Sequence, residues 1–255
     1  MGKTIAVANQ KGGVGKTTTC VNLSAALTEL GAKVLLCDMD PQGNATSGVG
    51  ISKAKSNPNI YNVLIEGVNA TDAIVSTEYG DLLPSNQILS GAGVELVVTD
   101  GREYILKNVL SQVVDLYDFI LVDCPPSLEM LTLNSLCAAD TVLIPVQCEY
   151  FALEGLTDLL GSIRLIKKAF NPNLEIEGVL LTMYDTRTNL SSQVAAEIKK
   201  HLSGKVYPVA IPRSVRIAEA PSHGTPVLEY DRHSRGAVAY IQFAKELYKQ
   251  NKKKK

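Results

Sequence analysis

Long hydrophobic runs and paired cysteines are missing from this sequence. No stretch approaches the roughly 18 to 20 consecutive apolar residues that cross a membrane, and the N-terminus reads as a strand rather than as an export signal. The five cysteines are an odd number without a C-x-x-C pair, so they indicate neither a disulfide framework nor a zinc knuckle. His201, His223 and His233 lack metal-ligand spacing. We therefore expect a cytoplasmic protein with no membrane partner.

Net charge is also nearly missing. The chain has 25 Lys and Arg residues against 26 Asp and Glu residues, which gives a formal net charge of −1 at pH 7 and a sequence pI near 6.3. A whole-protein basic field that would draw the molecule to DNA or to anionic lipid is therefore excluded. Any binding to a polyanion must come from a local patch.

Internal repeats and linkers rich in proline or serine are missing too, and strand-like stretches alternate with helical ones along the chain. This alternation predicts an α/β fold with a mostly parallel, twisted sheet and helices on both of its faces. With 255 residues, 45% of them hydrophobic, the chain can bury a large core without a disulfide or a metal. We expect one domain over residues 1–255, with a disordered lysine tail at 252–255.

The expected elements follow from apolar runs and from helical periodicity. Strands are predicted at Thr4–Ala8, Val34–Cys37, Leu82–Pro84, Phe119–Val122, Thr141–Val146, Glu177–Thr182 and Val206–Val209. Helices are predicted at Thr17–Leu30, Arg102–Asp115, Leu153–Phe170, Ser191–Leu202 and Arg235–Gln250. Gly31 is expected to close the first helix, and the segment Gly43–Pro58, dense in Gly, Ser and Asn, is expected to be a mobile surface loop.

The first predicted strand runs into residues 9–18, NQKGGVGKTT, and then into a helix, which is the setting of a phosphate-binding loop. Gly12, Gly13 and Gly15 allow successive backbone N–H groups to point at phosphate oxygens, and the helix adds its positive end. Lys16 supplies a charge to the β- and γ-phosphates, and the Thr17 hydroxyl can ligate Mg²⁺. With ATP and Mg²⁺ as cofactors, the predicted nucleotide-binding residues of this loop are Gly12, Gly13, Val14, Gly15, Lys16, Thr17 and Thr18.

Three carboxylates follow two other predicted strands. Asp38 and Asp40 leave the second strand at positions i and i+2, on the same side of an extended backbone, so both could lie near Mg²⁺ and an attacking water. Asp123 ends the apolar run Phe119–Val122, as in a Walker B motif, and is expected to reach Mg²⁺ through water. Ligands bind at the carboxyl ends of such strands. We therefore predict that these carboxylates meet beside the phosphate loop.

A second lysine, Lys11, precedes the glycines and makes the loop K-G-G-x-G-K-T. This deviant Walker A signature resembles that of the ParA/Soj, MinD and nitrogenase iron protein ATPases. The likeness to ParA/Soj proteins extends over nearly the whole chain, through Asp38–Gly50, CPPSL at 124–128 and IPRSVRIAEAPSHGTP at 211–226. It implies that Lys11 reaches across a two-fold axis to the partner's nucleotide in an ATP-sandwich homodimer. From the residues alone, Lys11 could also be a solvated loop charge.

The resemblance also implies roles at the catalytic centre and around the base. Asp40 would position or activate the attacking water, with Lys11 and Lys16 as the other catalytic residues, while Asp38 would support the metal shell. The stretch around Pro212 would hold the adenine mainly through its backbone. Ser214 stands where the family commonly has Asn, and its hydroxyl can still hydrogen-bond a purine or a ribose.

Partners are implied by the same resemblance. ParA/Soj dimers bind double-stranded DNA without sequence preference through arginines that this sequence matches at Arg187 and Arg216. A ParB-type protein bound to centromere-like DNA stimulates a slow hydrolysis, and release from DNA follows. The expected function is thus ATP-dependent DNA partitioning by a nucleoid-associated ATPase.

Two other functions remain open from the sequence. A MinD-like positioning ATPase would use its last helix on a membrane surface; a core-packing helix and a DNA-touching tail are the other interpretations of Arg235–Gln250 and the lysines after it. A metallocluster carrier would need ligating cysteines, and no cysteine lies between Cys37 and Cys124.

Overall fold

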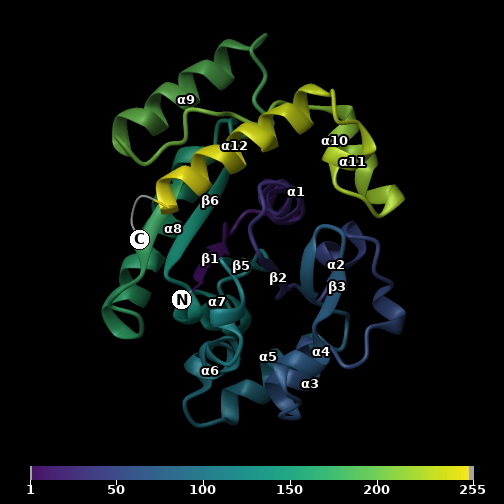
Figure 1. The fold of residues 1–255 in the computed structure, drawn as a ribbon. Helices are drawn as coiled ribbons and strands as arrows, with labels where there is room; N and C mark the ends of the chain where they lie inside the picture. Colours follow the sequence, from purple (N-terminus) through teal and green to yellow (C-terminus); the bar gives the residue numbers. More distant parts are fainter. Residues whose placement is uncertain (1, 253–255) are drawn as a thin grey trace.

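The structure, a computed structural model, describes residues 2–252 and has a sheet in the order β3-β4-β2-β5-β1-β6-β7 (Figure 1). The strands are β1 (Lys3–Val7), β2 (Val34–Asp38), β3 (Val75–Thr77), β4 (Gly80–Leu83), β5 (Phe119–Asp123), β6 (Thr141–Gln147) and β7 (Glu175–Thr182). The β3–β4 pair is antiparallel and the other neighbouring pairs are parallel. The predicted mostly parallel sheet is confirmed.

Helices follow most of the strands. They are α1 (Lys16–Glu29), α2 (Asn44–Gly48), α3 (Ile60–Ile65), α4 (Ala70–Ala73), α5 (Leu89–Glu95), α6 (Ile105–Ser111), α7 (Met130–Ala138), α8 (Ala152–Ala169), α9 (Asn189–His201), α10 (Val215–Glu219), α11 (Val227–Tyr230) and α12 (Arg235–Lys252). Short 3₁₀ turns lie at Lys53–Lys55, Leu96–Val98, Arg102–Tyr104, Val114–Leu116 and Ala220–His223. All the strands from β1 to β7 except β3 begin within two residues of the strands that the sequence predicts.

Two apolar cores cover the two faces of the sheet. Successive residues of a strand point to opposite faces, so Ala6 belongs to one core, together with residues of α3 and α5–α8, whereas Ile5 and Val7 belong to the other. In the second core, α12 packs along α1 (Figure 1) and buries Phe243 and Leu247. The core-packing interpretation of the last helix is therefore confirmed.

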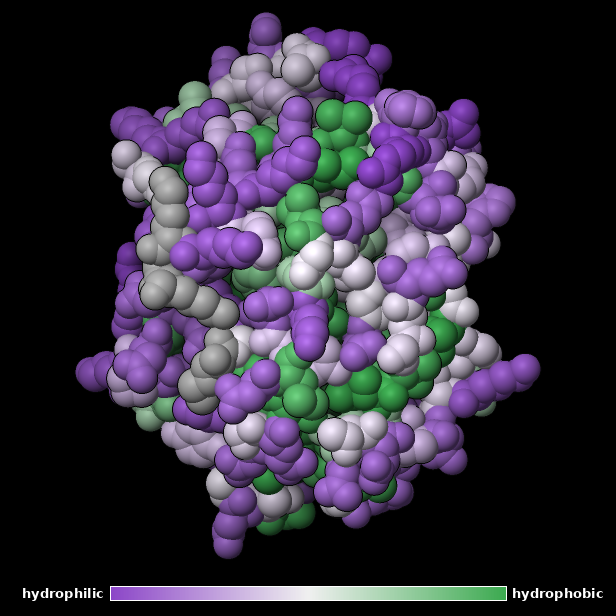
Figure 2. Space-filling view, in the orientation of Figure 1, coloured by the Kyte–Doolittle hydropathy of each residue, from purple (hydrophilic) through white to green (hydrophobic). Residues whose placement is uncertain are grey.

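The surface carries its apolar groups in separate areas. On the face shown in Figure 2, hydrophobic side chains gather in several patches that hydrophilic side chains interrupt. Between residues 2 and 252, no helix combines the length and the apolar character needed to cross a membrane. The described cysteines are buried and unpaired, in agreement with the sequence.

One predicted strand is wrong, and one predicted helix is shorter than expected. Residues Val206–Val209 form no strand: Val206 makes a single bridge to Val179, and Pro208, which has no N–H to donate, prevents a longer ladder. The helix predicted at Arg102–Asp115 is limited to α6, with 3₁₀ turns on both sides. Near its end the Ser111 hydroxyl donates to the Asn108 carbonyl at 2.7 Å and competes with the helical hydrogen bonds.

The predicted mobile loop Gly43–Pro58 is also wrong. It contains α2, in which Ala45 and Thr46 are fully buried. Gly43 has a φ of +61°, and a Cβ there would come within 2.7 Å of the Ser85 carbonyl, so glycine allows close packing at this position. At the other end of the chain, Lys252 belongs to α12, contrary to the predicted disordered tail, while 253–255 lie outside the described residues.

Candidate functional site

The glycine loop lies between the carboxyl end of β1 and the start of α1. Gly13 and Gly15 have φ values of +73° and +91°, in the left-handed region that favours glycine. Apart from its neighbours in the chain, a Cβ added to Gly12 or Gly13 would meet no atom of the described residues within 4 Å, so there is open space beside both glycines. The first turn of α1 has no side-chain cap and no acidic residue within the described chain. Its free N–H groups suit an anion.

Two side chains that the sequence analysis missed hold this loop in shape. The Asn9 amide donates to the Pro145 carbonyl at 2.7 Å and accepts the Lys11 backbone N–H at 3.0 Å. The Thr182 hydroxyl, at the end of β7, donates to the Val14 carbonyl at 2.8 Å. Asn9 follows β1 by two residues, and Thr182 is the last residue of β7. Their polar character at the end of an apolar run was the available signal.

The two lysines of the loop have different surroundings. Lys16 is 7% exposed and its ammonium donates to the Lys11 carbonyl at 3.0 Å. Burial lowers the pKa of Lys16, while the Asp123 charge acts in the opposite direction. In contrast, the Lys11 ammonium lies 3.2 Å from a Glu149 carboxylate oxygen and 5.7 Å from the centroid of the Phe151 ring. In the single chain, Lys11 thus contacts the segment that leads from β6 into α8.

The three predicted carboxylates meet at the carboxyl edge of the sheet. Asp38 of β2 is paired in register with Asp123 of β5, and both are fully buried, whereas Asp40 is 8% exposed. Burial raises the pKa of Asp38 to about 6, against the hydrogen bonds from Thr46. Burial and the Asp38 charge raise the pKa of Asp123 well above its ordinary value. The site is therefore an acidic cluster held out of water beside Lys16.

The oxygens of Asp38 are occupied by donors of the chain. One oxygen accepts the Thr46 backbone N–H at 2.8 Å and its hydroxyl at 2.7 Å, and the other accepts the Asp40 N–H at 3.2 Å. Asp40 in turn accepts the Gln42 N–H at 2.9 Å, and the Ser85 hydroxyl donates to its carbonyl at 2.8 Å. Asp38 consequently fixes the turn that places Asp40.

Asp123 keeps one oxygen free. Its Oδ1 accepts the Cys20 thiol at 3.6 Å, and the nearby Thr17 hydroxyl acts to lower the pKa of the carboxyl, against the effect of burial. Its Oδ2 is buried without a hydrogen-bond partner among residues 2–252. A buried carboxylate oxygen is costly unless a cation or a donor satisfies it. This oxygen therefore suits the water shell of a hard divalent cation, although between residues 2 and 252 no group of three or more His, Cys, Asp or Glu side chains is placed to hold a metal ion.

A pocket of about 530 Å³ opens beside the loop. Gly15 and Thr18 line one side of it, and Pro212 and Ser214, both predicted from the sequence, line another. Met183, which also lines it, has a φ of +48° and is the one non-glycine residue with positive φ in the described chain. This volume is in the range of small-molecule sites. The sequence analysis missed Met183 and Tyr240, whose side chains the fold alone brings to this pocket.

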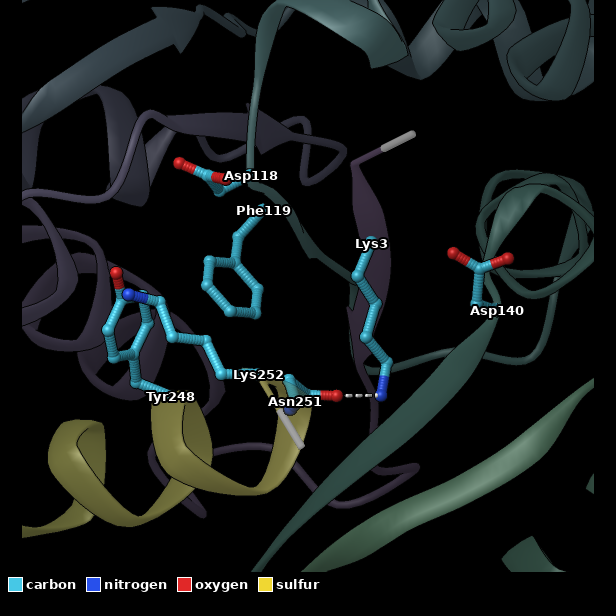
Figure 3. Close-up of a pocket in the computed structure, with 7 residues that line it drawn as sticks. All are labelled: Lys3, Asp118, Phe119, Asp140, Tyr248, Asn251 and Lys252. Carbon is cyan, nitrogen blue, oxygen red and sulfur yellow. Dashed lines mark hydrogen bonds between the residues drawn. The ribbon is translucent and has the colours of Figure 1, made fainter. Parts of the chain in front are cut away.

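Another cavity, of about 320 Å³, lies at the opposite edge of the sheet (Figure 3). Lys3 begins β1 there, Phe119 begins β5, and Asn251 at the end of α12 accepts a hydrogen bond from Lys3. Because ligands of parallel sheets bind at the carboxyl ends of strands, this cavity is not part of the candidate site.

The two predicted DNA-binding arginines lie on the surface, each in an ion pair. Arg187, with 84% of its side chain exposed, contacts Asp185 at 2.6 Å in the loop between β7 and α9. Its hydrogen bonds hold the pKa of Asp185 well below the usual range. Arg216 of α10 contacts Glu219 at 2.9 Å and Asp231 at 3.3 Å. Neither guanidinium is buried, so both can be reached from solvent.

The parallel sheet and the loop at its carboxyl edge define the chain as a P-loop NTPase, the class predicted from the motif. Comparisons with known proteins agree. A family model described as an AAA domain matches residues 2–176. The chain is 55% identical over 249 residues to the sporulation initiation inhibitor protein Soj of Bacillus subtilis (strain 168). The aligned residues cover 97% of this chain and 98% of that protein.

A second relative is the chromosome partitioning protein ParA of Caulobacter vibrioides (strain NA1000 / CB15N), 48% identical over 249 residues, with 96% and 93% of the two chains covered. Among solved structures, cobyrinic acid a,c-diamide synthase from Mycobacterium smegmatis, with bound ATP analog and magnesium, has a TM-score of 0.88 at 39% identity and covers 100% of this chain and 98% of that one. The chain belongs to the ParA/Soj family of partitioning ATPases.

Proposed function

We propose that this protein hydrolyses ATP to ADP and phosphate with Mg²⁺ and uses the cycle to partition DNA. The observation that carries the proposal is the free Asp123 oxygen, buried beside Lys16 and the open glycine loop. The buried carboxylate oxygen suits a cation, and the glycine loop with Lys16 suits an anion. Mg²⁺ and a nucleoside triphosphate supply both. The names of the relatives, Soj and ParA, support partitioning as the use of this chemistry.

In this proposal the loop residues Gly12, Gly13, Val14 and Gly15 cradle the phosphates through their backbone, with Lys16, Thr17 and Thr18 at the start of α1. Bound Mg²⁺ would neutralise phosphate charge. Asp123, through water, and the Thr17 hydroxyl would hold the Mg²⁺, and Asp38, whose oxygens already accept hydrogen bonds, would support its shell. The pocket with Pro212 and Ser214 receives the base.

Catalysis rests on positioning. Asp40 orients the attacking water, because its backbone is held by Asp38 and Ser85 and its charge acts on Lys16 of the loop. Lys16 stabilises the charge that develops on the transferred phosphoryl group. In an ATP-bound homodimer, Lys11 leaves Glu149 and reaches the phosphates of the partner's nucleotide. Slow hydrolysis suits a protein that switches between two states, and we expect a ParB-type partner to stimulate this hydrolysis.

The DNA-bound state is the ATP dimer, in the cytoplasm on the nucleoid. Arg187 and Arg216 contact DNA phosphates without sequence preference, and two-fold symmetry doubles this small basic patch. Doubling matters here because the whole chain has a net charge of −1 and offers no general attraction to DNA.

The test is retardation of a non-specific DNA duplex by the Asp40→Ala variant, which should trap the ATP dimer, with ATP or ADP at low and high salt. We expect binding that requires ATP, weakens with salt and is reduced by adding Arg216→Ala. Dimerisation is followed separately by sedimentation. An ATP-dependent dimer that ignores DNA at every salt concentration would contradict the partitioning proposal.

A further inference from the structure

Two acidic side chains hold Arg216 in place. Nη1 of Arg216 donates to Glu219 at 2.9 Å, and its Nε lies 3.3 Å from Asp231. Glu219 also accepts the Tyr230 hydroxyl at 3.2 Å, and the Tyr230 ring stacks on His223 at 4.9 Å between centroids. The guanidinium is therefore bound from two elements, its own helix α10 and the residue that follows α11.

The local charge around Arg216 is negative. One guanidinium faces two carboxylates, so this group carries a net charge of −1, and the Arg187–Asp185 pair carries none. A DNA phosphate that approaches Arg216 must compete with carboxylates already within hydrogen-bond distance. The arginine is 53% exposed, so its remaining N–H donors still face solvent.

Helix α10 also borders the pocket proposed for the base. Val215 and Ile217 line that pocket, while Arg216 between them makes the ion pairs described above. One short helix thus presents neighbouring side chains to the nucleotide and to the acids. A shift of this helix on binding in the pocket would therefore also move Arg216.

We propose that Glu219 and Asp231 form an acidic clamp that restrains Arg216 and weakens the binding of DNA phosphate by each subunit. This inference rests on the proposed DNA-binding function. With the clamp, a single subunit binds DNA weakly. The dimer binds DNA more tightly, because its two clamped arginines contact the same duplex. The clamp also keeps the complex weak enough to be released after hydrolysis.

The experiment measures the Kd of a short non-specific DNA duplex for the ATP-bound dimer by fluorescence anisotropy, in the Asp40→Ala background. Glu219→Gln and Asp231→Asn should each tighten binding about three- to tenfold at low salt, because each removes a competing charge near two phosphates per dimer. The gain should shrink as salt rises. Glu229→Gln is the matched control, since Glu229 lies on the same segment and is not an ion-pair partner of Arg216 in the described chain.

A double-mutant cycle separates a clamp from a general change of charge. In an Arg216→Ala background, Glu219→Gln should bring no gain, because the group it released is gone. An equal gain from Glu229→Gln, or a gain that survives Arg216→Ala, would overturn the clamp. So would unchanged or weaker binding by both clamp variants. If neither the parent dimer nor any variant binds DNA, the proposed function fails. DNA binding that appears only in the clamp variants would support the clamp and contradict the proposed function of the parent protein.

Discussion

Asp123 carries a buried carboxylate oxygen that is costly to the chain by itself. Its Oδ2 is buried without a partner in the described chain, next to the charge of Asp38. Asp123→Asn removes that repulsion, so we expect a higher melting temperature without nucleotide, by about 2–4 °C for each kcal/mol gained. Mg²⁺ and ATP should raise the melting temperature of the parent protein, and this increase should be lost in the variant.

Thermal unfolding with and without Mg²⁺ and ATP checks this expectation. Asp72→Asn, a change of an exposed acid in α4, serves as the control and should keep the nucleotide-dependent rise. A variant at 123 that is less stable without nucleotide, or that keeps the full rise with Mg²⁺ and ATP, would show that the free oxygen does not face the cation.

Residues within the motif could be predicted from sequence, and those that support it could not. Strand ends and glycine spacing predicted Lys16, Asp38, Asp40 and Asp123, and the structure brings these four residues together. Thr182 lies far from the loop in sequence, and its bond to the Val14 carbonyl exists only once β7 has joined the sheet. A pairing of that kind depends on tertiary structure, which local patterns do not contain.

At the scale of elements, a buried polar network joins β7 to β1 and α12. Glu177 accepts hydrogen bonds from Lys3 and from Asn251, and its side chain is 3% exposed. Burial alone would raise the pKa of Glu177, but the hydrogen bonds from Lys3 and Asn251 outweigh it and lower the pKa below 4.5. A carboxylate with a lowered folded pKa stabilises the protein above its unfolded pKa and loses that effect as pH falls through the folded value.

We therefore predict that Glu177→Gln reduces the free energy of unfolding by roughly 1–3 kcal/mol at pH 7, and that the difference from the parent shrinks below about pH 4. Urea unfolding of the parent and the variant at several pH values measures this difference in the free energy of unfolding. Glu175→Gln is the control on the same strand, where the pair with Lys167 is largely exposed, and should change stability by less than about 0.5 kcal/mol. A constant difference from pH 7 to pH 3 would rule out the ionised Glu177 as its source.

Elements were predictable where one pattern dominated. Strands β2 and β5 are buried throughout and read as continuous apolar runs, which is what a parallel sheet covered on both faces requires. The segment Gly43–Pro58 misled because its Gly, Ser and Asn residues also suit tight packing and side-chain hydrogen bonds, as at Thr46 and Asp38. Composition alone does not separate these two uses.

For the whole molecule, the net charge of −1 means that the proposed DNA binding would depend on a few symmetric contacts. If Arg187 and Arg216 of both subunits contact phosphates, the slope of log K against log salt should be about −3 to −4, since each contact contributes roughly −0.9. Arg187→Ala removes two contacts per dimer and should make the slope less steep by about 1.8. The measurement is anisotropy of a labelled duplex over a salt series, with ATP and the Asp40→Ala background. Lys33→Ala, an exposed change at the amino end of β2, should leave the slope unchanged. An equal effect of the Lys33 change, or no effect of Arg187→Ala, would mean that binding follows overall charge and not this arginine.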